Sequence, residues 1–252
     1  MATIPTPSPV TPGASETQAS INHIGRMAGA LFSPKPTFED IARRPSWLAP
    51  IVFLTVLSLV FCYVMNQRVD WDSFIRQQAE KNPRFAQLSD DQKQRALGPQ
   101  TRFAPTFTYI IGALGPTGFA LFLTLVFWGA FNLLAGANLR FGTSFGISAH
   151  AIMPSAIGSI LGMVVMYLRK PGEVDPEHIV ASNLGALVSS DAPKWLEKLA
   201  ASADLFWIWT LLLLATGFSA ANPKKIPMGK ALGITFGVYI ALRLMVVGWA
   251  AI

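Results

Sequence analysis

The chain has 252 residues, of which 52% are hydrophobic and 13% are charged, and its formal net charge is +6. This balance excludes a water-soluble globular surface, a disordered protein and a collagen, and a single cysteine, Cys62, excludes a disulfide-stapled secreted module. Together with a mean hydropathy of +0.42, the composition predicts an all-α polytopic membrane protein. Five crossings of roughly 20 residues each would use about 100 residues and leave the rest for loops and a tail.

The first part of the chain predicts a tail followed by a membrane-surface segment. Residues 1–20 are rich in Pro, Ser and Thr and contain no apolar run, so we expect a disordered tail. Residues 21–47 are expected to form an interfacial helix that leads into the membrane, with a core-packing helix as the alternative. Thr37 and Asp40 resemble a capping box that opens a short helical turn. The helix is indicated by apolar residues at helical spacing: Ile21, Ile24, Ala28 and Leu31.

Five apolar segments predict five transmembrane helices in a membrane domain over residues 48–252. The run 106–136 is longer than one crossing, because as a helix it would extend about 46 Å through a hydrocarbon core of roughly 30 Å. Three glycines and a proline at 112–118 predict a bend or break there. Ser89 and Gln92 predict a capping box at the start of a loop helix. The predicted spans are 48–66, 114–136, 145–168, 204–221 and 229–251, with polar loops at 67–105 and 169–203.

The charge distribution predicts a cytoplasmic N-terminus. Eight basic and three acidic residues lie on the N-terminal side of the predicted domain, against eleven and ten on the opposite side. The raw basic count favours the reverse orientation, but the positive-inside rule applies best to short loops. The turns on the N-terminal side are short, and Arg43 and Arg44 directly precede the first span. We therefore expect a multi-pass cell-membrane protein that contacts anionic lipid headgroups, and we expect no nucleic-acid partner.

Small residues recur at every fourth position of the last predicted span, as Gly229, Gly233, Gly237 and Ala241. Such a strip lets another helix backbone approach closely in lipid. We interpret it as a packing surface, within one chain or between chains of a homo-oligomer, rather than as a ligand groove. Other membrane proteins are the second class of expected partner.

Two opposite charges lie at membrane depth in the last two spans. In an antiparallel hairpin, Asp204 and Arg243 fall at the same level. A charge at this depth is costly unless it pairs or reaches the interface. The sequence leaves both outcomes open, an ion pair or two side chains that extend separately to the headgroups.

Two further residues in the spans could serve a polar site. His150 could relay protons or contact a substrate, and Asn132 could share that site, but a hydrogen bond to a neighbouring helix is the more common role of such residues. Pro154 interrupts the third span. No metal-ligand spacing or Walker loop is present, and the G-x-S-x-G match at 142–146 opens a predicted helix rather than following a strand. We expect no enzyme activity and no cofactor.

Three stretches of the chain resemble the bacterial branch of the Yip family, the Ypt/Rab-interacting membrane-protein domain. They are 36–42 (PTFEDIA) followed by Pro45, Trp47 and Pro50, 143–151 (TSFGISAHA) with Pro154, and 204–209 (DLFWIW) with Leu214 and Gly217. The resemblance covers the chain from about residue 30 to its C-terminus. It implies a five-helix membrane domain with a cytoplasmic N-terminus and carries no catalytic residue.

The resemblance implies a partner class only for eukaryotic members, which associate with Rab-type GTPases and with one another. The loop at 67–105 and the Pro-rich tail depart from that compact pattern. The first functional hypothesis is therefore a non-enzymatic membrane scaffold or adaptor. The alternative is a component of a small-molecule or lipid transporter or permease, motivated by interrupted spans and by His150 and Asn132 at depth.

Overall fold

The computed structural model describes residues 21–176, 179–188 and 192–250, so the predicted disordered tail lies outside the described residues. Among these residues the regular structure is helical, apart from one isolated bridge between Asn183 and Asp204. The helices are α1 His23–Phe32, α2 Pro34–Arg43, α3 Leu48–Arg68, α4 Trp71–Glu80, α5 Pro83–Ala86, α6 Asp90–Ala135, α7 Phe141–Ala151, α8 Pro154–Leu168, the 3₁₀ helix η1 Leu184–Leu187, α9 Lys194–Ala201, α10 Leu205–Ala221 and α11 Met228–Ala250.

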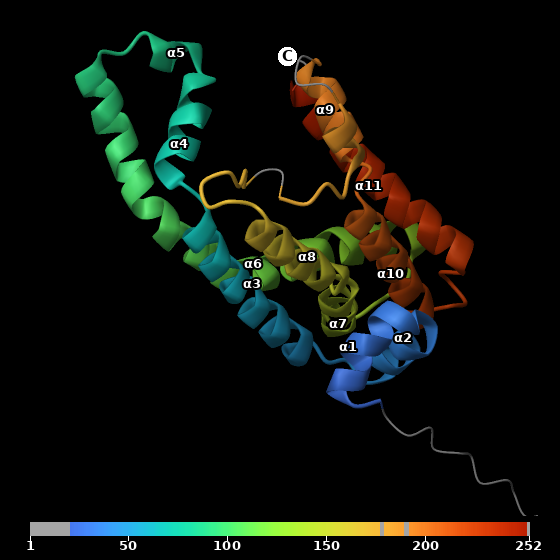
Figure 1. The fold of residues 1–252 in the computed structure, drawn as a ribbon. Helices are drawn as coiled ribbons and strands as arrows, with labels where there is room; N and C mark the ends of the chain where they lie inside the picture. Colours follow the sequence, from blue (N-terminus) through green and yellow to red (C-terminus); the bar gives the residue numbers. More distant parts are fainter. Residues whose placement is uncertain (1–20, 177–178, 189–191, 251–252) are drawn as a thin grey trace, which may run out of the picture.

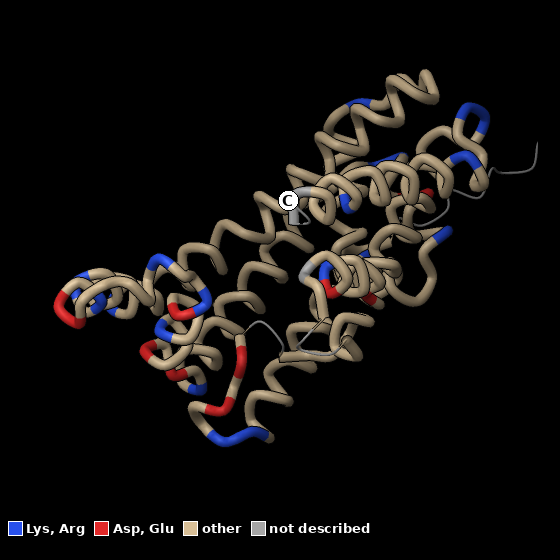
Figure 2. The backbone as a smooth tube through the Cα atoms, turned by 90° about the horizontal axis from the view of Figure 1, so that it is seen from above, with Lys and Arg blue, Asp and Glu red and all other residues tan. Residues whose placement is uncertain are grey.

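The predicted all-α polytopic fold is confirmed. Four described helical stretches are long and apolar enough to cross a membrane, and they are Leu48–Arg68, Asp90–Ala135, Phe141–Leu168 and Met228–Gly248. Helix α10 is apolar but has only 17 residues, or about 25 Å of helix. Figure 2 shows long stretches without charge in the helices, with charged residues gathered mainly at connections and helix ends.

Helix α6 differs most from the expectation drawn from the sequence. The predicted break at 112–118 is wrong, because α6 is one continuous helix of 46 residues, about 69 Å along its axis. Figure 1 shows that this helix changes direction along its length. Its first part lies beside α4, as Figure 1 shows, so the excess length continues into the polar-loop region. The capping box is confirmed, since the Ser89 N–H donates to Gln92 Oε1 (3.0 Å) and the Gln92 N–H donates to Ser89 Oγ (3.4 Å). Gly136, with φ 58°, ends the helix in the left-handed region.

The third apolar stretch consists of two helices rather than one. Helix α7 ends at Ala151, a turn at Ile152 and Met153 follows, and Pro154 is the first residue of α8. Proline is well suited to this position, because it lacks the N–H that would be unpaired there.

The core lies where α2, α6, α7 and α10 meet. Phe131 of α6 stacks on Phe218 of α10 with ring centroids 4.4 Å apart. Helix α2 contributes Phe38 and Ile41, both fully buried. Gly217 permits this packing, because a Cβ at that position would collide with Ile147 and lie 2.9 Å from Phe38. The second half of the segment expected at the membrane surface is therefore also part of the core.

The predicted capping box at Thr37 and Asp40 is wrong. Both residues lie inside α2, and the Thr37 hydroxyl donates to the Ser33 carbonyl (2.8 Å) instead of capping the helix. Helix α2 already begins at Pro34, because proline can occupy its first turn. Asp40 is thereby free to face α1.

Candidate functional site

A buried ion pair joins the two N-terminal helices. Arg26 Nη2 of α1 lies 2.7 Å from Asp40 Oδ2 of α2, and Arg26 Nε donates to the same oxygen at 2.8 Å. Arg26 Nη1 also donates to the Arg44 carbonyl (3.0 Å) and to Ser46 Oγ (2.6 Å). One guanidinium thus ties α1 to α2 and to the connection before α3. Since Phe38 and Ile41 anchor α2 in the core, the pair holds α2 in a defined position.

A row of charged side chains lies on α2 at helical spacing. Lys35, Glu39 and Arg43 follow one another at every fourth residue and therefore share one side of the helix. The row faces the C-terminal end of α10 and the beginning of α11. By holding α2 in place, the Arg26–Asp40 pair positions these charges over the C-terminal end of α10.

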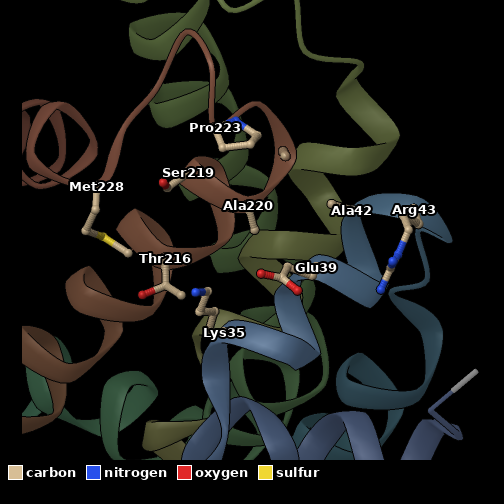
Figure 3. A pocket seen from close by; sticks show the side chains of 10 residues that line it. Lys35, Glu39, Ala42, Arg43, Thr216, Ser219, Ala220, Pro223 and Met228 are labelled. Carbon is tan, nitrogen blue, oxygen red and sulfur yellow. The ribbon is translucent and has the colours of Figure 1, made fainter. Parts of the chain in front are cut away.

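The charged row and the end of α10 line an open cavity of about 570 Å³ (Figure 3). This volume lies within the range typical of small-ligand sites, roughly 300–1,000 Å³. Its α2 side is charged, while α10 and the following turn contribute two hydroxyl groups and an apolar surface. The residues that line it are Lys35, Glu39, Ala42 and Arg43 of α2, Thr216, Ser219, Ala220 and Ala221 of α10, and Pro223 and Met228 beyond it.

Asp204 and Arg243 have different partners in the structure. The Asp204 carboxylate accepts from the Trp207 N–H (2.9 Å) at the start of α10 and from the Ser182 hydroxyl. Arg243 Nε donates to the Tyr239 hydroxyl (3.1 Å), and the guanidinium lies 5.8 Å from the centroid of the Trp207 ring. Both residues are within the described chain, where no ion pair joins them. They nevertheless lie at the same end of the hairpin, because both contact Trp207.

The glycine strip of α11 faces away from the rest of the chain. A Cβ added at Gly229, Gly233 or Gly237 would meet no atom within 4 Å. In the most apolar part of Met228–Gly248, 11% is buried inside the structure. The corresponding share is 28–39% in the other three long stretches. Gly162 of α8 shows the contrast, since a Cβ there would lie 2.9 Å from Phe61 of α3.

The polar residues predicted at depth make separate local bonds. His150 is fully buried, and its Nδ1 lies 2.9 Å from the Gly146 carbonyl, one turn earlier in α7. Asn132 connects α6 to the following turn, because Oδ1 accepts from the Leu139 N–H (2.7 Å) and Nδ2 donates to the Leu139 carbonyl (3.3 Å). Neither lines the cavity in Figure 3.

The Arg26–Asp40 pair and the cavity were not predicted from the sequence. One signal was available for the pair. Arg26 and Asp40 carry opposite charges, and each lies in a short amphipathic segment of the kind that packs with one face buried. The cavity had no such signal, because its walls come from residues 35–43 and 216–228, which are far apart in the chain. Among the described residues, no group of three His, Cys, Asp or Glu side chains could hold a metal ion.

Comparison with known protein families gives a match over most of the chain. The family model described as the Yip1 domain matches residues 28–251, which is nearly the whole described chain. A comparison with curated proteins and one with solved structures find no match.

Proposed function

Since the chain belongs to the Yip1 domain family, we propose that it acts as a non-enzymatic scaffold or adaptor in a cell membrane. In this proposal it is a multi-pass protein of the bacterial inner membrane with its N-terminus in the cytoplasm. It would assemble with a second copy of itself through α11 and hold other membrane proteins near that assembly.

The outward-facing glycine strip of α11 is the observation that carries the proposal. Ala231 and Thr235 on one side of α11 are fully buried against the chain, whereas Gly229, Gly233 and Gly237 on another side face open space. In lipid, burial of apolar area contributes little to helix association, while small residues allow close backbone contact. A strip with this shape is available for an intermolecular contact.

A second copy fits the strip because the surface is smooth and can match itself. In a two-fold dimer the same patch of both subunits meets. Two α11 helices could then cross at their glycines without a side chain between them.

Replacing Gly233 and Gly237 together with Leu tests this assembly. The expected result is loss of the dimer, measured as the protein mass by light scattering in mild detergent and by crosslinking in native membranes. Gly118→Leu is the matched control, since a Cβ at Gly118 of α6 also meets nothing within 4 Å. A protein mass unaffected by the double substitution would contradict assembly through α11.

The alternative function is a component of a small-molecule or lipid transporter or permease. One observation favours it: His150 Nε2 is buried and has no hydrogen-bond partner among the described residues. However, His150 Nδ1 bonds to Gly146 and the Asn132 amide bonds to Leu139, so the two residues do not form a shared polar site. A shared site would support the alternative better. Flux of a labelled solute or lipid into proteoliposomes that is lost in His150→Ala would favour transport over the scaffold.

A further inference from the structure

We propose that the cavity between α2 and the C-terminal end of α10 binds the headgroup of an ethanolamine phospholipid, with the phosphate at Lys35 and the ammonium group at Glu39. This inference is independent of assembly through α11, so the two can fail separately.

Two side chains of opposite charge line the cavity. Lys35 and Glu39 are four residues apart on α2, a spacing at which Lys and Glu can pair. Within the described chain, neither side chain makes an ion pair or a hydrogen bond. Figure 3 shows both side chains extending from α2 toward Thr216 and Ala220 of α10. A ligand with one negative and one positive group could therefore satisfy both side chains at once.

The opposite wall suits the remainder of a lipid. Ser219 is 8% exposed and has a hydroxyl that can donate to a phosphate oxygen. Ala220, Ala221 and Met228 provide an apolar surface beside it. The cavity thus changes from charged to apolar across its width, as a phospholipid does from its headgroup to its acyl chains.

The length of α10 places this cavity at a suitable depth. Its 17 residues extend about 25 Å, while the hydrocarbon core is roughly 30 Å thick. If α10 spans the core, its ends fall only a few Å inside the headgroup layer, or the bilayer thins locally to meet them. The cavity lies at the end where Pro223 follows and two lysines, Lys224 and Lys225, mark the aqueous boundary.

The carboxylate selects among headgroups. The primary ammonium of ethanolamine can donate hydrogen bonds to Glu39, whereas the quaternary ammonium of choline has no hydrogen to donate. A glycerol headgroup has no positive charge to offset the carboxylate. Ethanolamine thus matches both Lys35 and Glu39, whereas a serine headgroup would bring its own carboxylate next to Glu39.

Binding of short-chain lipids to the purified full chain tests the proposal. Native mass spectrometry in mild detergent would compare dihexanoyl phosphatidylethanolamine with the choline and glycerol analogues and with free phosphoethanolamine. The ethanolamine lipid is expected to bind roughly tenfold more tightly than the other two lipids, as one charge-assisted hydrogen bond provides. Equal binding of the three lipids would overturn the proposal, and equally tight binding of free phosphoethanolamine would overturn the assignment to a lipid.

Two variants separate the two charges. Glu39→Gln is expected to remove the preference for ethanolamine and keep lipid binding, whereas Lys35→Gln is expected to weaken binding of all three lipids. Lys230→Gln, an exposed lysine on α11 that does not line the cavity, is the control and should bind as the natural chain does. A thermal unfolding scan without lipid verifies that each variant folds. Retention of the ethanolamine preference in Glu39→Gln would overturn the site.

Discussion

Arg26 and Asp40 form an ion pair between two short helices, and their side chains are only 5% and 9% exposed. The guanidinium also contacts the Arg44 carbonyl and Ser46 Oγ, so its donors face α2 and the chain that leads to α3. A buried charge without its partner is strongly unfavourable, which makes this pair a sensitive point of the fold.

Asp40→Ala is expected to lower the free energy of unfolding by about 3–5 kcal/mol, because it leaves the Arg26 charge buried without a partner. The double variant Arg26→Met, Asp40→Leu should regain most of this loss, since no charge then remains buried. Denaturant unfolding in mild detergent measures both effects.

The exposed pair between Asp72 and Arg76 provides the control for the buried one. Both side chains are more than half exposed, with their charged atoms 3.3 Å apart. Asp72→Ala should cost less than about 1 kcal/mol. Equal losses for Asp40→Ala and Asp72→Ala would show that burial of the first pair has no energetic consequence.

Gly112→Ala is expected to destabilise the contact between α3 and α6. A Cβ at Gly112 would lie 2.7 Å from Cys62 Sγ, and overpacking of this kind costs typically about 1–3 kcal/mol. Cys62→Ala removes the colliding sulfur, so the double variant should lose less than the sum of the two single losses. Gly118→Ala, on an open side of the same helix, should be neutral or stabilising by up to about 1 kcal/mol.

Asp204→Ala and Asp204→Asn distinguish a helix cap from an ion pair with Arg243. The Asp204 side chain accepts from the Trp207 N–H, and Asn can make the same bond. We expect Asn to preserve stability and Ala to cost about 1 kcal/mol. The opposite result would be that Asp204→Asn lowers stability as much as Asp204→Ala, and that adding Arg243→Leu to either variant causes no further loss. Stability would then depend on the negative charge and its pairing with Arg243.

Thiol labelling in whole cells tests the proposed orientation. With Cys62 buried in α3, a cysteine introduced at Ser89 should react with a membrane-impermeant maleimide, and one introduced at Lys224 should react only after the cells are opened. The reverse pattern would invert the topology. Labelling at both positions in intact cells would place both on the outer side. That result would contradict the odd number of crossings proposed between them.

Much of the helical content follows from local properties of the chain. The capping box at Ser89 and Gln92 and the uncharged run that became α3 depend on neighbouring residues, so the sequence predicted both. Local signals were insufficient for α6. The glycines and Pro116 predict an interruption from the local sequence alone, and that prediction is the same whether or not tertiary contacts keep the segment helical. Gly112 lies against Cys62, where it allows two helices to approach, and it interrupts neither of them.

The composition and hydrophobic pattern alone determined that this protein is an all-α membrane protein, since the cost of placing polar backbone and charge in lipid acts on each segment separately. The tertiary structure decided which residues meet. The α2 charges reach the end of α10 only because Phe38 and Gly217 bring α2 against α10. Contacts between residues so far apart in the chain depend on how helix surfaces fit together, and no local pattern encodes that fit.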